Sequence, residues 1–320
     1  MTEKITLSPE VLKKLEQLSD KFAREGQNLS DYLEGMLHAD YLSYWDYIEL
    51  ETLLSLQKPR TEQKDEMIFV TYHQVTELYF KLILWELEQI NQGEARDSAV
   101  FLDKIQRINR YFKQLSDSFS IMTEGLDREQ FARFRMSLMP SSGFQSVQYR
   151  LIEVLSTDLI NLVHADYVLW LSSDDPVDAY LDHLYWKTGA RDAESGEKTL
   201  TLRQFEAKYD KLLLDKAREY RKKNLRSRAQ VHIKNGNMDI ITALREMDQW
   251  SNVYWPLAHF RAAVRHLVSN QNVKGATGGT NWRKYLPPRF QRVVFFPELW
   301  SEEEKENWGK SWVMKHVKDF

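Results

Sequence analysis

The stretch DEMIFVTYHQVTELYFKLILWELEQI, residues 65–90, predicts a long helix and sets the fold class. Four residues recur at helical spacing and therefore share one face of this helix: Phe69, His73, Thr76 and Phe80. A histidine among aromatic side chains is suited to accept a proton or to bind a metal near neutral pH. It is equally suited to a core in which its ring nitrogens find partners. The segment by itself leaves both interpretations open.

The composition indicates a chain with a sizeable core and no thiol chemistry. Its 320 residues are 42% hydrophobic and 12% aromatic, and the formal net charge is −3. This charge provides no global field that would favour nucleic acid or an anionic membrane. The absence of cysteine excludes disulfides, thiolate metal sites and covalent haem attachment. The charged N-terminal segment and the lack of any long apolar run lead us to expect a soluble, cytoplasmic protein without membrane or nucleic-acid partners.

Helical patterns follow one another along nearly the whole chain. We expect helices over residues 9–22, 30–37, 44–56, 65–90, 97–122, 129–136, 145–170, 202–224 and 240–269, the last disturbed at Pro256. Residues 171–200 hold turn signals and little periodicity, so they predict a loop-rich insertion with a short helix at 177–186. No β-hairpin signal of weight appears. The basic run 218–228 is typical of a solvated helix face, with nucleic-acid binding as the alternative. The sequence therefore predicts one all-α domain over residues 1–320.

Two segments carry polar groups suited to binding a small anion. Arg135 ends the run Arg133-Phe134-Arg135 and is followed by MPSSGF, residues 139–144. Arginine clamps a carboxylate through two parallel hydrogen bonds, and a glycine lets the backbone approach a ligand closely. The loop GATGGT, residues 275–280, is neither a P-loop nor a dinucleotide fingerprint. It fits either a loop that closes over a ligand or a flexible linker.

A further helix places two histidines on one face. The segment WPLAHFRAAVRH, residues 255–266, has His259 and His266 seven residues apart, with small Ala262 and Ala263 between them. This arrangement leaves room beside a histidine for a flat group, and a helical histidine is a common axial ligand of haem iron. There is no HExxH motif and no His and carboxylate cluster with zinc or non-haem iron spacing.

Taken in order, these segments resemble the tryptophan 2,3-dioxygenase family of haem enzymes. The stretches that carry the resemblance run from about residue 41 to 300: SYWDYIELETLLSLQ (43–57), DEMIFVTYHQVTELYFKLILWELEQI (65–90), FRMSLMPSSGFQSVQYRLIE (134–153), WxxxH (255–259), ATGGT (276–280) and FFPELW (295–300). The resemblance implies an all-α fold with a haem pocket between long helices.

The resemblance also implies roles for individual residues. His73 corresponds to the distal histidine that hydrogen-bonds the indole N–H of the substrate, Arg135 to the arginine that binds its carboxylate, and His259 to the proximal iron ligand. The remaining implied contacts are Phe69 and Phe131 at the indole, Thr277 at the amino-acid end, Ser142 and Gly143 at the haem, and Tyr44, Tyr47 and Ile48 donated by a neighbouring subunit. The N-terminal helices, about residues 1–57, would thus serve another subunit of a homotetramer.

One assignment stays open within the resemblance. The interval from His259 to the TGG loop is about one helical turn longer than in the family, whereas His266 makes it too short by a similar amount. The WxxxH spacing favours His259, and His266 is its rival. Ala276 also stands where the family usually has glycine.

The implied activity is haem-dependent dioxygenation. Non-covalent haem b and O₂ would convert L-tryptophan to N-formyl-L-kynurenine, with His73, Arg135 and Thr277 orienting the substrate. The alternatives are a haem monooxygenase acting on tryptophan, tyrosine or a derivative on the same scaffold, a non-enzymatic haem-binding protein, and a helical interaction module without a cofactor.

Overall fold

The all-α fold class is confirmed in a computed structural model of the chain. The structure describes residues 7–40, 42–93, 97–139, 141–172, 174–192, 195–269, 272–273 and 286–310. The chain forms two compact units, an N-terminal unit, Met1–Gln57, and a main unit, Lys58–Phe320. No helix of the described residues combines the length and the apolar character needed to span a bilayer.

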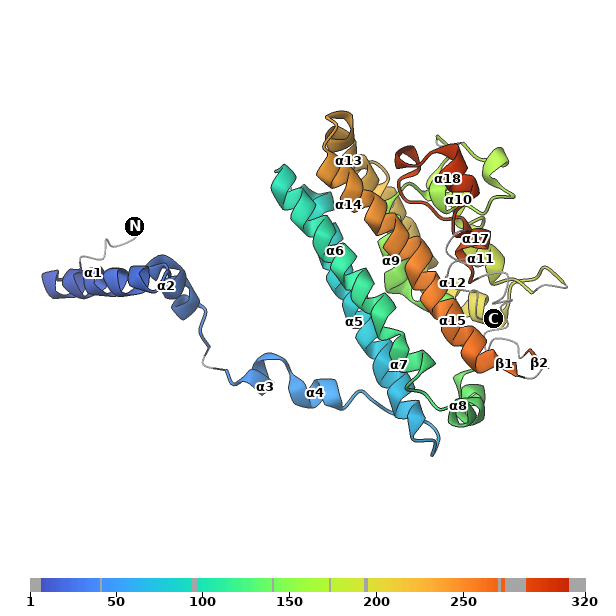
Figure 1. The fold of residues 1–320 in the computed structure, drawn as a ribbon, viewed down its shortest axis with the longest axis horizontal. Coiled ribbons are helices and arrows are strands. Elements are labelled where there is room, and N and C mark those ends of the chain that lie inside the picture. Colours follow the sequence, from blue (N-terminus) through green and yellow to red (C-terminus); the bar gives the residue numbers. More distant parts are fainter. Residues whose placement is uncertain are drawn as a thin grey trace. The chain divides into compact units, whose positions relative to one another are not determined.

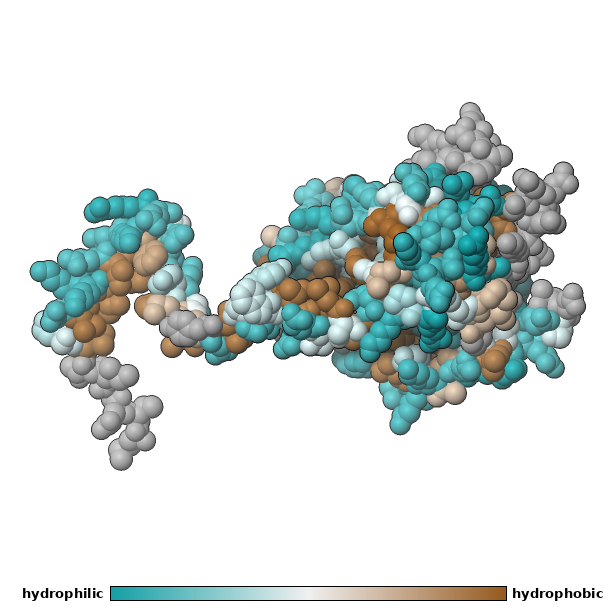
Figure 2. All heavy atoms as spheres, turned by 90° about the horizontal axis from the view of Figure 1, so that it is seen from below, coloured by the Kyte–Doolittle hydropathy of each residue, from teal (hydrophilic) through white to brown (hydrophobic). Residues whose placement is uncertain are grey.

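The N-terminal unit consists of short amphipathic helices. Its elements are α1 Pro9–Arg24, α2 Leu29–Leu37, α3 Tyr44–Tyr47 and α4 Leu50–Leu54. Ser8 caps α1, because its side-chain oxygen accepts a hydrogen bond from the Val11 N–H. None of the residues in these four helices is buried. Brown and teal surfaces divide along this unit in Figure 2. The Phe22 ring of α1 packs on the Tyr32 ring of α2 at a centroid distance of 4.7 Å, but most of the apolar side of the two helices stays exposed.

Long helices that pack lengthwise build the main unit (Figure 1). Its elements are α5 Asp65–Gln92, α6 Ser98–Ser118, α7 Ser120–Thr123, α8 Arg128–Phe134, α9 Val147–Ser156, α10 Val177–Leu181, α11 Tyr185–Gly189, α12 Leu200–Tyr220, α13 Leu225–Lys234, α14 Met238–Gln249, α15 Trp255–Leu267, α17 Pro288–Gln291 and α18 Glu302–Glu306, with 3₁₀ turns at Arg135–Leu138, Gly143–Gln145, Leu159–Leu162, Val168–Trp170 and Pro297–Leu299. The core lies between α5, α6, α9, α12 and α14.

Helix α5 follows its sequence pattern closely. Buried Glu66 accepts hydrogen bonds from the backbone N–H groups of Arg60 and Thr61 at 2.9 and 2.7 Å, which ties the preceding turn to the first turn of the helix. Gly93 ends the helix in the left-handed conformation, at φ 86°. Buried side chains including Phe80, Ile83 and Leu87 face the core.

Four local predictions were wrong. The single short helix expected at 177–186 is two helices, α10 and α11, which are separated by residues 182–184. The helix expected at 44–56 is broken into α3 and α4 by Glu49, which adopts a left-handed conformation at φ 52°. The helix expected at 145–170 ends at Ser156, because Thr157 is extended and its hydroxyl donates to the Phe295 carbonyl oxygen at 2.5 Å. A small antiparallel hairpin, β1 Val268–Ser269 with β2 Asn272–Val273, forms where none was expected.

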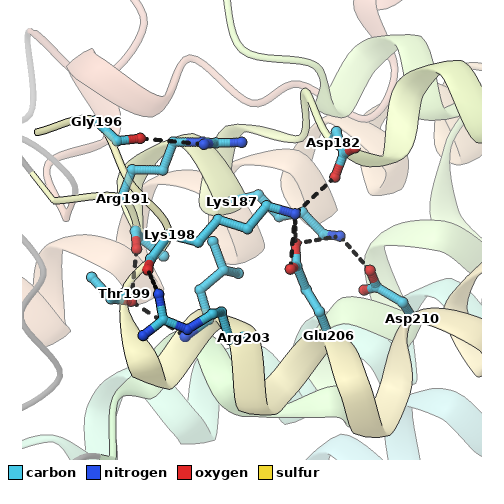
Figure 3. A network of polar contacts seen from close by, with 11 residues as sticks. Asp182, Lys187, Arg191, Gly196, Lys198, Thr199, Arg203, Glu206 and Asp210 are labelled. Atoms are coloured by element: carbon cyan, nitrogen blue, oxygen red, sulfur yellow. Dashed lines mark hydrogen bonds and ion pairs between the residues drawn. The ribbon is translucent and has the colours of Figure 1, made fainter.

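A network of ion pairs and hydrogen bonds joins the insertion at 171–200 to helix α12 (Figure 3). The Lys187 side chain is 1% exposed, and its Nζ lies 3.0 Å from Glu206 Oε1 and 2.7 Å from Asp210 Oδ2 on α12. Lys198 Nζ joins Glu206 Oε2 at 2.9 Å and Asp182 Oδ1 at 3.4 Å. The insertion is therefore held by charged groups that converge on one face of α12.

The disturbance expected at Pro256 is a π-helical turn, Trp250–Tyr254, between α14 and α15. The three segments follow one another without a loop. This turn determines how the helix that carries His259 leaves α14.

Candidate functional site

His73 lies on α5 with its ring accessible to solvent, although surrounding protein lowers the pKa of the imidazole. Its Nδ1 is 2.7 Å from the Phe69 carbonyl oxygen. Because a carbonyl only accepts, Nδ1 carries the proton and Nε2 keeps a free lone pair. The Phe69 carbonyl and the Glu77 carboxylate oppose the shift, and burial remains its main cause.

Aromatic rings from two helices surround this histidine. The Phe69 ring lies 4.1 Å from the His73 ring, 6.1 Å from the Phe131 ring and 5.6 Å from the Phe134 ring, between centroids. Phe131 and Phe134 belong to α8, which packs against α5. Together these rings form an apolar wall beside His73, in which Phe134 is fully buried.

His259 lies on α15, close enough to His73 for that histidine to affect its pKa. Burial, and then the nearby His73, lower the pKa of His259 to about 4. The imidazole is therefore neutral at physiological pH, with a ring nitrogen able to bind a metal. Its ring stacks on Phe119 at a centroid distance of 5.7 Å and an interplanar angle of 21°. The structure thus brings both histidines to one region.

Gly143 of the Ser142–Gly143 segment lies against the imidazole ring of His259. A Cβ atom at Gly143 would lie 3.1 Å from Cε1 of the imidazole and 3.9 Å from its Nε2. Any side chain at this position would stand against a group bound at Nε2. The Ser142 N–H donates to Gln145 Oε1 at 3.0 Å, which holds the turn that presents Gly143.

His266 is engaged elsewhere. Its Nε2 lies 2.6 Å from the Met122 carbonyl oxygen, and its ring is 4.9 Å from the Phe131 ring. The side chain is buried, and among the described residues its Nδ1 has no hydrogen-bond partner. Its contact with the Met122 carbonyl occupies the nitrogen that most helical histidines would offer to iron.

The other predicted residues are placed as follows. Arg135 begins the 3₁₀ turn after α8, is buried, and has its pKa lowered by that burial. Tyr44, Tyr47 and Ile48 belong to the N-terminal unit, where both tyrosines are exposed. Thr277 lies outside the described residues.

Sequence reasoning missed three aromatic residues of this region, Phe119, Phe134 and Tyr72. Phe119 packs on His259 and also on Trp255, at a centroid distance of 4.8 Å. It continues the apolar spacing of Phe112 and Leu115 along α6, so extending that stripe by four residues would have found it.

A cavity of about 400 Å³ lies in another part of the main unit, between α9, α10 and α12. It contains none of the predicted site residues, and its Asp158 is already hydrogen-bonded to Asn224 and paired with Arg226. Across the described residues, no three His, Asp or Glu side chains form a metal-binding group. We therefore take the region of His73 and His259, with its aromatic rings, as the candidate site.

Comparison with known proteins identifies relatives of one kind. A family model described as tryptophan 2,3-dioxygenase matches residues 31–167. The tryptophan 2,3-dioxygenase of Bradyrhizobium diazoefficiens is 29% identical over 277 residues, which cover 81% of this chain and 91% of that protein. The corresponding enzyme of Bacillus thuringiensis (strain Al Hakam) is 27% identical over 293 residues, 87% of this chain and 99% of that protein. A shorter match, to the enzyme of Ruegeria sp., is 41% identical over 119 residues, 36% of this chain and 41% of that protein.

Proposed function

We propose that this chain belongs to the tryptophan 2,3-dioxygenase family and that it inserts both atoms of O₂ across the indole C2–C3 bond of L-tryptophan to give N-formyl-L-kynurenine. One observation carries the proposal: His73 and His259 belong to one aromatic cluster, because the rings of Tyr72 and Phe119 lie in contact with each other and with one histidine each. A substrate that is aromatic and needs a hydrogen-bond acceptor fits that region.

The donor set fits haem b held through one axial histidine. A porphyrin supplies four nitrogen ligands itself, so the absence of a three-residue metal cluster in the described part of the chain poses no difficulty. His259 is neutral, stacked on Phe119 and faced by a glycine, whereas His266 Nε2 contacts the Met122 carbonyl. These contacts favour His259 over His266 as the iron ligand. When bound, haem would supply the binding and activation of O₂.

The chain's own residues orient the substrate. His73 donates from Nδ1 to the Phe69 carbonyl, so its Nε2 would accept the indole N–H. Phe69 and Phe131 would pack on the indole ring and keep water from it. The buried Arg135 guanidinium would bind the substrate carboxylate, and Thr277 its amino-acid end. Ser142 and Gly143 would line the haem.

A neighbouring subunit would complete the pocket. Two apolar surfaces support a homotetramer: the uncovered side of the N-terminal unit and an outer stripe of α5, formed by the exposed Met67, Val75, Leu78, Leu82 and Trp85. Large exposed apolar patches mark interaction surfaces. In this proposal Tyr44, Tyr47 and Ile48 serve the pocket of another copy. The cytoplasmic location stays a prediction.

Product identification tests the activity. The protein expressed with haem, then reduced and mixed with O₂ and L-tryptophan, should form N-formyl-L-kynurenine. A hydroxylated tryptophan would replace the proposal with the monooxygenase alternative. Haem binding without any product would leave a haem-binding protein, and a protein with no haem absorbance would refute every haem-dependent reading.

Mixed assemblies test the shared pocket. Tyr44→Ala and His73→Ala should each lower activity when expressed alone. Co-expression should restore part of it, since some pockets in a mixed assembly then contain neither substitution. If Tyr44 served its own subunit, each pocket would carry one substitution and no activity would return.

A further inference from the structure

The helix that carries His259 is turned by one inserted residue. The Trp255 N–H donates to the Trp250 carbonyl, five residues back, so Trp250–Tyr254 forms a π turn. Pro256 follows and has no N–H, which prevents the α-helical pattern from continuing onto Asn252. One extra residue rotates the following helix by about 100° relative to an uninterrupted one. The face that α15 presents to His73 therefore depends on this turn.

A buried carboxylate holds the π turn from α14. Asp248 is 0% exposed and accepts four hydrogen bonds. The donors are Asn252 Nδ2 at 3.1 Å, the Phe295 N–H at 2.5 Å, the Phe296 N–H at 3.1 Å and Trp300 Nε1 at 2.9 Å. One donor lies inside the π turn and three lie in the FFPELW segment, residues 295–300. Asp248 thus joins the turn to a distant part of the chain.

The joined segment packs against the start of α15. Val253 of the π turn and Leu257 of α15 form one buried cluster with Val294, Trp300 and Trp308. Leu257 lies two residues before His259. A displacement of residues 294–308 would therefore reach the backbone from which the imidazole projects.

We propose that Asp248 is a positioning residue for His259, which it directs by fixing the π turn and the FFPELW segment around the base of α15. The proposal rests on the proposed function, in which His259 binds haem iron. Asp248 is not expected to touch haem or substrate. Its carboxylate is suited to this role because all four partners are donors. An asparagine would keep the shape of the side chain, but its NH₂ group would face at least one of these four donors and could not accept its hydrogen bond.

The test is the iron–histidine bond itself. In reduced, O₂-free protein the iron–imidazole stretching band in the resonance Raman spectrum reports the orientation and strength of that bond. We expect Asp248→Asn to shift or broaden this band and to speed the transfer of haem to apomyoglobin about tenfold. The matched control is Glu298→Gln, which loosens the same segment at Arg226 and Gln230 without touching the π turn.

The outcomes separate the two proposals. A wild-type protein without an iron–imidazole band refutes the proposed function and this inference with it. A wild-type band that Asp248→Asn leaves unchanged overturns the inference alone. The inference is also overturned if Glu298→Gln shifts the iron–imidazole band as much as Asp248→Asn does, when both variants lose the same amount of thermal stability.

A milder variant covers the case in which Asp248→Asn does not fold. Trp300→Phe removes one donor to Asp248 and keeps an aromatic ring in the cluster. It should shift the band in the same direction by a smaller amount. If Trp300→Phe retains the wild-type band and the wild-type rate of haem loss, the positioning role is wrong.

Discussion

Lys187→Met removes a cation from a buried site and leaves two carboxylates behind. The Lys187 side chain is 1% exposed, and its partners Glu206 and Asp210 are 13% and 27% exposed (Figure 3). Methionine matches the aliphatic stem of lysine, so the change removes charge and hydrogen bonds and keeps most of the volume. The insertion at 171–200 would lose its most buried ionic contact with α12.

The expected cost follows from that burial. Removing one partner of a buried ion pair costs about 3–5 kcal/mol, and the partial exposure of both carboxylates places this case near about 3 kcal/mol. For a unit of this size, such a loss lowers the melting temperature by about 6–12 °C. Lys198→Met is the matched control. Its side chain is 32% exposed, so we expect a loss of about 1 kcal/mol or less.

The pH dependence provides a second readout. Burial raises the pKa of Asp210, and Lys187 opposes that shift, so the variant should raise this pKa further. A carboxyl with a raised folded-state pKa loses stability as pH rises. Thermal unfolding should therefore show a larger deficit at pH 8 than at pH 4.5. Equal deficits for Lys187→Met and Lys198→Met, or a deficit that grows as pH falls, would refute the reasoning.

Three further predictions concern the candidate site. His73→Ala should lower kcat/KM for L-tryptophan about tenfold, by loss of one hydrogen bond, and should change kcat/KM for 1-methyltryptophan little because that substrate has no indole N–H to donate. In the apoprotein, burial lowers the pKa of His259 from 6.5 to about 4. Between these pH values the unfolded chain binds a proton at His259 and the folded protein does not, so the free energy of unfolding decreases as pH falls. His259→Gln should recover up to about 3 kcal/mol of this decrease, measured by denaturant titrations at low pH. Gly143→Ala should weaken haem binding about tenfold, measured by haem titration, because its Cβ would lie 3.1 Å from Cε1 of the His259 ring and would force that ring to shift.

Strong local patterns predicted the main elements of the fold. The helix expected at 65–90 extends over Asp65–Gln92, because an acidic first turn, a continuous apolar face and Gly93 all agree. The helix expected at 145–170 failed because its end depends on Thr157 meeting the Phe295 carbonyl, a contact between residues 138 positions apart. No local pattern contains that information.

The same distinction applies to the candidate site. The spacing of Phe69 and His73 is visible along one helix, and the structure keeps their rings in contact. The different surroundings of His259 and His266 come from tertiary contacts, with Phe119 for the first and the Met122 carbonyl for the second. These partners lie on other elements, so the helix pattern alone presented both histidines, and only the WxxxH spacing of the resemblance favoured His259.

Isotope labelling of the product tests the central claim most directly. Reduced, haem-loaded protein is given L-tryptophan and O₂ labelled in both atoms, and the product mass is measured. Dioxygenation predicts N-formyl-L-kynurenine that carries both labelled atoms from one O₂ molecule. A product that carries a single labelled atom, with the indole ring intact, would contradict the account.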